Sequence, residues 1–232
     1  MRIISWNCNG AFRNKLRFIS ELEPDILIIQ ECEDLKKIEF DMFSKPIYEG
    51  YWFGGENKSK GLGFFIMHEG ISSLPVMWEI EEDLVVPKVI CYKDQKILLF
   101  SIWTWPPKYN WAIIQSIRKY SKIIRHFKTI CMGDFNAPYI AEDERFQKNI
   151  YNVANEFRKQ GMLSIYHERA NVNFGSENEF TWFRHKKATQ PYFLDYCFIS
   201  QSLLPDVIAY RIERFQDWRF HSDHCPIVLE IK

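Results

Sequence analysis

The sequence has no excess of positive charge, and this absence limits how the protein can bind polyanions. Lysine and arginine together number 30, as do aspartate and glutamate, so the formal net charge is zero. Proteins that bind nucleic acid usually carry a basic excess, because contacts to phosphates release counterions. Binding to nucleic acid would therefore need a local basic patch on this chain.

The sequence also lacks paired cysteine motifs and long apolar runs. Its six cysteines form no Cys-x-x-Cys pair, which argues against a zinc site. Most of them lie in apolar runs, so we expect buried free thiols in a protein of a reducing compartment. No apolar run is long enough to cross a bilayer, and no basic and apolar regions of a signal peptide precede the first strand pattern. We expect a cytoplasmic monomer that does not associate with membranes.

No repeat, linker or low-complexity segment divides the chain, so we expect one domain over residues 1–232. Short apolar runs typical of strands covered on both faces alternate with helical stripes and hairpin signals. The expected strands are 3–6, 26–29, 48–53, 62–67, 84–92, 97–103, 130–132, 180–183, 192–199, 207–212 and 226–231. The expected helices are 15–22, 111–127 and 146–159. This α/β pattern fits two mixed sheets packed face to face with helices outside.

Polar residues follow apolar, strand-like runs at several places along the chain. They are Asn7 and Asn9 in segment 5–10, Glu31 after 26–30, Asp134 and Asn136 in 132–138, Asp195 in 193–196, and Asp223 and His224 in 222–229. This set resembles the endonuclease/exonuclease/phosphatase superfamily, which includes exonuclease III-like nucleases, deoxyribonuclease I, sphingomyelinases and inositol-polyphosphate phosphatases. The resemblance covers essentially the whole chain. It implies a four-layer α/β/β/α sandwich and metal-assisted hydrolysis of a phosphate ester.

The resemblance places the principal metal-binding carboxylate at Glu31. A divalent cation in a phosphodiesterase needs hard oxygen ligands and open positions for substrate and water, which suits Mg²⁺ or Mn²⁺. Asn7 would help to hold the metal or a bound water, and Asp223 would complete the site or support one of its ligands. Taken alone, a glutamate at a strand end is most often simply solvated, and an asparagine shortly before Gly10 can be a turn former.

The segment from Gly133 to Pro138 is the most specific local motif. Aspartate, asparagine and proline are all ordinary in a type I turn, so a plain turn explains these residues equally well in isolation. The resemblance implies that Asp134 aligns the attacking water or accepts its proton, and that Asn136 donates to a non-bridging phosphate oxygen. Fixed groups of this kind suit phosphate hydrolysis, because positioning and charge stabilisation dominate that reaction.

His224 precedes the last expected strand, and a lone histidine in such a turn is usually structural. The resemblance pairs it with Asp195. A carboxylate that is hydrogen-bonded to an imidazole fixes its tautomer and raises its pKa above the ordinary value of about 6.5. The sequence leaves open whether His224 acts as a general base or as a cationic clamp on the phosphate.

One segment departs from the family pattern. After the strand at 97–102, many members carry a tyrosine or histidine that reaches the phosphate, whereas this chain has Trp103, Thr104 and Trp105. Thr104 is the nearest alignable residue, and its hydroxyl can hydrogen-bond a phosphate oxygen. An indole N–H is only a donor and cannot accept a proton. This departure puts a close match to abasic-site endonucleases in doubt.

Few residues point to the substrate. The resemblance to exonuclease III-like nucleases implies that Trp182 lines the pocket beside the scissile phosphate, although an aromatic residue in a strand is equally often part of the core. Asn9 is a secondary candidate for substrate contact. Basic residues form two small clusters, Arg184, Lys186 and Lys187 in one and Lys58 and Lys60 in the other. Basic side chains with exposed aromatic rings suit single-stranded or distorted nucleic acid, but such clusters are often plain surface.

The sequence therefore predicts a divalent-metal-dependent phosphodiester hydrolase, and the first interpretation is a nuclease acting on DNA or RNA. The alternative enzyme is a phosphatase or phosphodiesterase for a small-molecule, inositol or lipid-headgroup phosphate ester. A third alternative, a silent binding module on this fold, would require a broken site. The polar residues of all the motifs are present, which argues against it.

Overall fold

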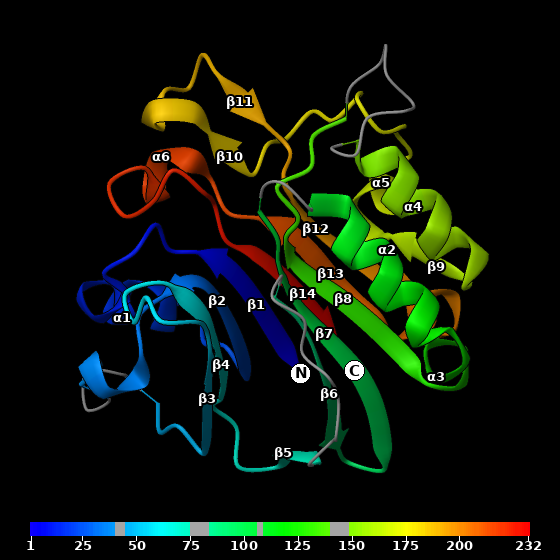
Figure 1. The fold of residues 1–232 in the computed structure, drawn as a ribbon, viewed down its shortest axis with the longest axis horizontal. Coiled ribbons are helices and arrows are strands. Elements are labelled where there is room, and N and C mark those ends of the chain that lie inside the picture. Colours follow the sequence, from blue (N-terminus) through cyan, green and yellow to red (C-terminus); the bar gives the residue numbers. More distant parts are fainter. Residues whose placement is uncertain (40–44, 75–83, 106–108, 140–148) are drawn as a thin grey trace.

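Two mixed six-stranded sheets form the centre of the computed structural model (Figure 1). The structure describes residues 1–39, 45–74, 84–105, 109–139 and 149–232. The first sheet has the order β13 (Val207–Ile212), β14 (Ile227–Ile231), β1 (Arg2–Asn7), β2 (Ile26–Cys32), β4 (Gly61–Ile66) and β3 (Glu49–Phe53). The second has the order β5 (Ile71–Leu74), β6 (Leu84–Tyr92), β7 (Gln95–Trp103), β8 (Lys128–Asp134), β12 (Asp195–Ser200) and β9 (Met162–Ser164).

The continuous apolar runs have both of their faces buried. Alternate residues of a strand point to opposite faces of the sheet. Ile26 and Ile28 of β2 therefore join the core that lies between the two sheets. Leu27 and Ile29 join a second cluster on the outer face, where they meet Leu16 of α1 (Leu16–Ser20). The predicted α/β/β/α sandwich is thus confirmed, with apolar layers on both sides of the first sheet.

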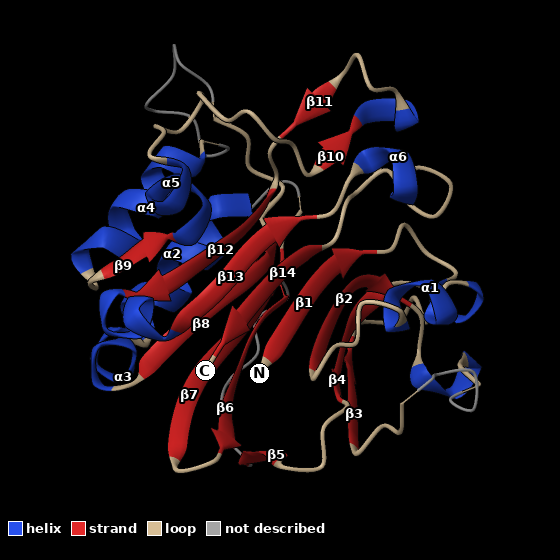
Figure 2. Cartoon of the chain, turned by 180° about the vertical axis from the view of Figure 1, so that it is seen from behind, coloured by secondary structure: helices blue, strands red, loops and turns tan. Residues whose placement is uncertain are grey.

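Helices cover the outer face of the second sheet (Figures 1 and 2). They are α2 (Tyr109–Lys119), α3 (Ser121–His126), α4 (Ile150–Lys159) and α5 (Ile165–Ala170). On the other side of the molecule, α6 (Phe215–Trp218) packs Trp218 against Trp6 of β1, with ring centroids 5.0 Å apart. No helix in the described ranges is long and apolar enough to span a membrane.

Two predicted elements are divided in the structure. The helix predicted for 111–127 breaks at Tyr120, which leaves helical geometry while its buried ring packs against Phe100 at 6.1 Å. The strand predicted for 192–199 breaks before Asp195, where the Thr181 hydroxyl accepts hydrogen bonds from the backbone N–H groups of Leu194 and Asp195. Of the helix predicted for 146–159, residues 146–148 lie outside the described residues.

The strand predicted for 180–183 is shorter and belongs to a separate hairpin. It consists of β10 (Trp182–Phe183) and β11 (Pro191–Tyr192), with the short 3₁₀ turn η4 (Arg184–Lys186) between them. The hairpin rises above the ends of β1, β12 and β14, next to α6 (Figures 1 and 2). It therefore borders the edge of the sheets where the predicted site residues lie.

Candidate active site

Four of the predicted residues meet where strands of the two sheets end. Asn7 ends β1 in the first sheet, and Asp134 ends β8 in the second. Asp195 begins β12 and is the direct antiparallel partner of Asp134. His224 lies just before β14, which pairs with β1. All four residues are buried.

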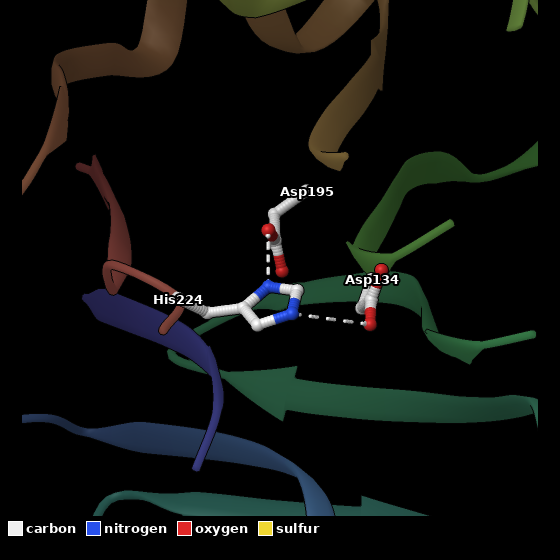
Figure 3. A group of neighbouring side chains, drawn as sticks. All are labelled: Asp134, Asp195 and His224. Atoms are coloured by element: carbon white, nitrogen blue, oxygen red, sulfur yellow. Dashed lines mark hydrogen bonds and ion pairs between the residues drawn. The ribbon is translucent and has the colours of Figure 1, made fainter. Parts of the chain in front are cut away.

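The imidazole of His224 lies between two carboxylates (Figure 3). Its Nδ1 donates to Asp195 Oδ2 over 2.8 Å, and its Nε2 faces Asp134 Oδ2 at 4.0 Å. Since an ionised carboxylate can only accept, Asp195 fixes the proton on Nδ1. The second ring nitrogen therefore faces Asp134 at an ion-pair distance that is longer than a hydrogen bond.

Burial and neighbouring charges shift the pKa values of His224 and of Asp134. Burial alone would lower the pKa of His224, but the charges of Asp195 and Asp134 outweigh it and raise the pKa above its ordinary value. Burial, reinforced by the charge of Asp195, raises the pKa of Asp134, while His224 and the hydrogen bonds from Asn7 and Asn136 oppose the rise. The geometry thus favours an imidazolium and makes Asp134 a stronger proton acceptor than an ordinary carboxylate.

Asparagine side chains hold the Asp134 carboxylate in place. Asn7 Nδ2 donates to Oδ2 over 2.9 Å, and Asn136 Nδ2 donates to the same oxygen over 3.0 Å. The backbone N–H of Asn136 donates to Oδ1 over 2.9 Å, and its Nδ2 also donates to the carbonyl oxygen of Thr104 over 2.7 Å. Both amide protons of Asn136 are therefore used inside the protein. In this geometry Asn136 positions Asp134, and the phosphate-donor role that the resemblance implied for it stays a prediction.

The turn that carries Asp134 requires a glycine before it. Gly133 has φ +153°, and a Cβ atom there would lie 2.0 Å from the carbonyl oxygen of Ile102. The absence of a side chain lets β8 lie against β7 while the chain turns toward the site. Asn136 follows in the left-handed region with φ 48°, which asparagine tolerates better than most residues.

Thr104 does not face the site. Its side chain is fully buried, and its hydroxyl donates to the carbonyl oxygen of Phe135 over 2.8 Å. Its backbone N–H donates to the carbonyl oxygen of Asp134. Thr104 therefore stabilises the turn after β8, and its hydroxyl donates within the protein at the place where the sequence predicts a substrate contact. The neighbouring Trp103 and Trp105 pack against each other, with ring centroids 4.8 Å apart.

Glu31 lies outside the buried group, at an irregularity in β2. The register between β2 and β4 shifts between Gln30 and Cys32, so Glu31 has no partner in the ladder. Its φ is 55°, which is uncommon for glutamate and costs free energy. Bulges of this kind often redirect a side chain beside an active site. The Glu31 side chain is 20% exposed and pairs with Lys60 Nζ at 2.6 Å.

Asp223 connects the buried group to the β10–β11 hairpin. Trp182 Nε1 donates to Asp223 Oδ2 over 2.9 Å, and the Trp182 ring lies 6.1 Å from the imidazole of His224. On its other side this ring lies 5.3 Å from the ring of Tyr192, which is 39% exposed. Trp182 is thus half-buried beside His224. Tyr192 was missed in the sequence, because an aromatic residue in a strand pattern usually indicates core.

Ser222 was also missed, although it precedes Asp223 and His224 directly. Its hydroxyl donates to the carbonyl oxygen of Asn7 over 2.7 Å and accepts the backbone N–H of His224 over 3.0 Å. Ser222 therefore fixes the His224 segment to the end of β1. The backbone N–H of Asn9 donates to Asn7 Oδ1 over 3.0 Å, and the Asn9 side chain is exposed.

The predicted basic cluster is exposed on the hairpin. Arg184, Lys186 and Lys187 lie in or directly after η4, and all three side chains reach solvent. Burial is the main cause that lowers the pKa of Lys15, and the charge of Lys186 lowers it further. Lys186 therefore lies near the loop that follows Asn9. The cluster provides exposed basic side chains on a chain of zero net charge, whereas the Lys15 ammonium group donates to the carbonyl oxygens of Cys8 and Gly10.

Among the described residues, one group of acidic and imidazole side chains lies close enough together to hold a metal ion, and the predicted metal ligand Glu31 lies outside it. Asp134, Asp195 and His224 each offer a ligand atom within 4.8 Å of the others, but their atoms already serve the hydrogen bonds described above. Glu31, with Asn7 and Asp223 as predicted neighbours, offers oxygen ligands only, and hard cations such as Mg²⁺ prefer oxygen. The ammonium group of Lys60 forms an ion pair with the Glu31 carboxylate. The donor chemistry therefore favours Glu31 for a hard divalent ion.

Comparisons with known proteins agree with this architecture. The model of the family described as Endonuclease/Exonuclease/phosphatase family matches residues 4–224. The chain is 23% identical over 257 residues to Recombination repair protein 1 of Drosophila melanogaster. That alignment covers 99% of this chain but only 37% of the relative.

Solved structures share the fold at low sequence identity. The endonuclease domain of TRAS1, a telomere-specific non-LTR retrotransposon, has a TM-score of 0.72 at 14% identity, over 100% of this chain and 97% of that chain. The AP endonuclease LMAP from Leishmania major has a TM-score of 0.75 at 14% identity, over 100% of this chain and 87% of that chain. The fold of these enzymes is therefore the fold of this chain.

Proposed function

The chain belongs to the endonuclease/exonuclease/phosphatase family, and on that premise we propose that it is a divalent-metal-dependent phosphodiester hydrolase that cleaves DNA or RNA. The observation that carries the proposal is the Asp195–His224–Asp134 arrangement, a buried imidazole between two carboxylates at the meeting of two sheets. Hydrolysis of a phosphodiester needs a cation to stabilise developing charge and a base to align water. In this arrangement the imidazolium of His224 offers the positive charge and the carboxylate of Asp134 offers the base.

In this proposal, Asp195 orients His224 and supports its charge. The imidazolium donates to a phosphate oxygen through Nε2, the nitrogen that faces away from Asp195. Asp134, with its raised pKa, accepts the proton of the attacking water. Asn7 and Asn136 keep the Asp134 carboxylate aimed at that water.

Glu31 would hold the divalent ion, with Asn7 and Asp223 as neighbours, and the bound Mg²⁺ or Mn²⁺ would supply positive charge to the phosphate. The bulge in β2 turns Glu31 out of the ladder, which supports a role other than packing. Its partial exposure leaves open positions for a substrate and for water.

Nucleic acid is the proposed substrate for three reasons. The basic cluster of the hairpin adjoins the site, and the exposed ring of Tyr192 beside Trp182 offers a surface on which bases stack. The Drosophila relative is named for recombination repair, and the two structural neighbours are endonucleases. We also propose that the chain acts as a single-domain monomer in the cytoplasm, in keeping with its six free cysteines.

A substrate panel tests the proposal. Purified protein is assayed on abasic duplex DNA, single-stranded DNA, RNA, a small phosphodiester reporter and a phosphomonoester reporter, each with Mg²⁺, with Mn²⁺ and with excess chelator. We expect cleavage of at least one nucleic acid, lost in chelator and lost in the His224→Ala variant prepared in parallel. Cleavage of the small reporters alone would favour the small phosphate ester instead. Full activity in chelator would contradict the metal mechanism.

A further inference from the structure

Lys60 is the residue that pairs with the proposed metal ligand. Glu31 is the unpaired residue of the β2 bulge, between the ladder pairs Gln30–Leu62 and Cys32–Gly61. Lys60 directly precedes Gly61, so the two side chains emerge from opposite strands at the same level. Lys60 Nζ lies 2.6 Å from Glu31 Oε2. No other ion pair of Glu31 is present within the described residues.

The backbone around Lys60 presents its ammonium group at this place. A Cβ atom at Gly61 would lie 2.5 Å from the carbonyl oxygen of Phe53 and 2.5 Å from the ring of Trp52. Because only glycine fits there, the strand that follows Lys60 is held tightly against β3. On its other side, the Lys60 N–H donates to the carbonyl oxygen of Asn57 over 3.2 Å. The position of Lys60 is thus set by β4 and by a turn, while its side chain remains 51% exposed.

The pairing conflicts with a divalent cation at Glu31. An ammonium group and a metal ion at the same carboxylate repel each other, because both carry positive charge. We therefore expect metal binding at Glu31 to weaken its contact with Lys60 and to favour displacement of the ammonium group. The flexible four-carbon stem and the exposure of Lys60 allow the ammonium group to turn away without a change of the backbone.

We propose that Lys60 neutralises Glu31 while the metal is absent, and that metal binding releases Lys60 to contact a phosphate of the nucleic-acid backbone. This inference rests on the proposed metal site at Glu31. A substrate phosphate bound at that ion lies within reach of the released ammonium group, which binds phosphate as a point charge. Since coupling between two ligands is reciprocal, metal strengthens substrate binding and substrate strengthens metal binding.

The first measurement is calorimetric titration of Mn²⁺ into the protein without nucleic acid. Lys60→Met removes the competing ammonium group, so we expect it to bind Mn²⁺ about two- to five-fold more tightly, the scale of a partly exposed ion pair. Lys58→Met is the matched control, because Lys58 Nζ lies over the Trp52 ring at 4.7 Å rather than at Glu31. This control should leave Mn²⁺ affinity unchanged. Glu31→Gln should lose most of the binding.

The second measurement is the affinity for a short duplex DNA with and without Mn²⁺, in a His224→Ala background that leaves the DNA intact. Mn²⁺ should raise the affinity of the His224→Ala parent more than it raises that of the same protein carrying Lys60→Met. In the protein that carries Lys60→Met, the slope of the logarithm of DNA affinity against the logarithm of salt concentration should be shallower than in the parent by about 0.9, the value for one lost phosphate contact. This change should occur only in the presence of Mn²⁺, because Lys60 is held by Glu31 without it.

The outcomes separate this inference from the proposed function. Glu31→Gln with unchanged Mn²⁺ affinity would remove the metal site itself, and with it the inference. Loss of binding in Glu31→Gln together with unchanged or weaker binding in Lys60→Met would overturn the inference while the metal site stands. A DNA affinity that falls equally with and without Mn²⁺ in Lys60→Met would make Lys60 a permanent phosphate contact, which also contradicts release by the metal.

Discussion

Asn7 Nδ2 donates a hydrogen bond of 2.9 Å to Asp134 Oδ2, and the two residues lie 127 positions apart in the chain. Asn7 belongs to β1 of the first sheet and Asp134 to β8 of the second, so the bond crosses from one sheet to the other. Asn7 is the proposed neighbour of the metal and Asp134 is the proposed base, so the packing of the two sheets sets the distance between these two parts of the site. Catalysis and core packing are coupled through this contact.

Asn7→Ala should reduce both activity and stability. The change removes a buried hydrogen bond to a carboxylate, which is worth about 1.5–3 kcal/mol. We expect kcat on the preferred substrate to fall by roughly ten- to a hundred-fold, and the free energy of unfolding in urea to fall as well. Asn155→Ala, on α4, is the control and should change neither. Normal kcat in Asn7→Ala would show that Asp134 is held adequately without it.

Asp195→Asn and His224→Ala should act as one unit. His224→Ala should lower kcat by about two or more powers of ten, the scale of lost acid–base catalysis. Asp195 acts through the 2.8 Å hydrogen bond to His224, so the double variant should be little slower than His224→Ala alone. Near-ultraviolet circular dichroism would check that the fold is intact. Losses that multiply in the double variant would indicate that Asp195 works independently of the imidazole.

Replacing the basic cluster should weaken the binding of nucleic acid without slowing the hydrolysis step. In the triple variant Arg184→Ala, Lys186→Ala and Lys187→Ala, we expect weaker nucleic-acid binding and a shallower dependence on salt, because fewer counterions are released. Hydrolysis of a small phosphodiester reporter should be nearly unchanged. The control replaces three basic residues on the helical layer, namely Lys122, Arg158 and Arg169. A triple variant with unaltered affinity and salt dependence would exclude the hairpin as the binding surface.

Gly133→Ala should destabilise the protein strongly. The new Cβ would lie 2.0 Å from the Ile102 carbonyl oxygen, and alanine disfavours φ +153°. We expect the free energy of unfolding to fall by more than about 2 kcal/mol, since steric strain at a special backbone conformation adds to the clash. Gly55→Ala is the matched control, because no atom lies within 4 Å of its added Cβ. Similar stability of the two variants would mean that β8 can shift freely against β7.

Glu156→Gln should alter how stability depends on pH. The hydrogen bond from Arg118 is the largest cause that lowers the pKa of Glu156 below 4.5, and Lys159 also contributes. Because the folded-state pKa is depressed, this stabilisation is present above about pH 4.5 and is lost as the pH falls through the folded-state pKa. We expect Glu156→Gln to be less stable than the parent at pH 7, and the difference to shrink on acidification. Urea denaturation across this range, with the exposed Glu168→Gln as control, checks it.

The sequence predicted the strands well where both of their faces are buried. Leu84–Tyr92 was predicted with its observed ends, and the hairpin to β7 formed as expected. Continuous apolar runs carry this information because each sheet packs on both sides. The break at Tyr120 could not be predicted, because the helical spacing of apolar residues continues through it, and the contact of its ring with Phe100 is a tertiary one.

The site residues were predictable as residue types, but their contacts were not. A sequence identifies Asn136 as a polar turn residue, whereas the use of both its amide protons depends on the Thr104 carbonyl oxygen and on Asp134. The bulge that turns Glu31 outward arises from the register between β2 and β4, which residue order alone does not fix. The Lys60–Glu31 pair follows from that register as well.

The pairing of β1 with β14 has a consequence for the synthesis of the protein. β1 is translated before its neighbour β14 and before Ser222, whose hydroxyl donates to the carbonyl oxygen of Asn7 from 215 positions further along the chain. A nascent chain thus has Asp134 and Asp195 but no imidazole between them. If the protein cleaves nucleic acid as proposed, an unfinished copy cannot attack the messenger RNA or the ribosomal RNA beside it. The proposed activity therefore requires that β14 has paired with β1, which brings His224 between Asp134 and Asp195.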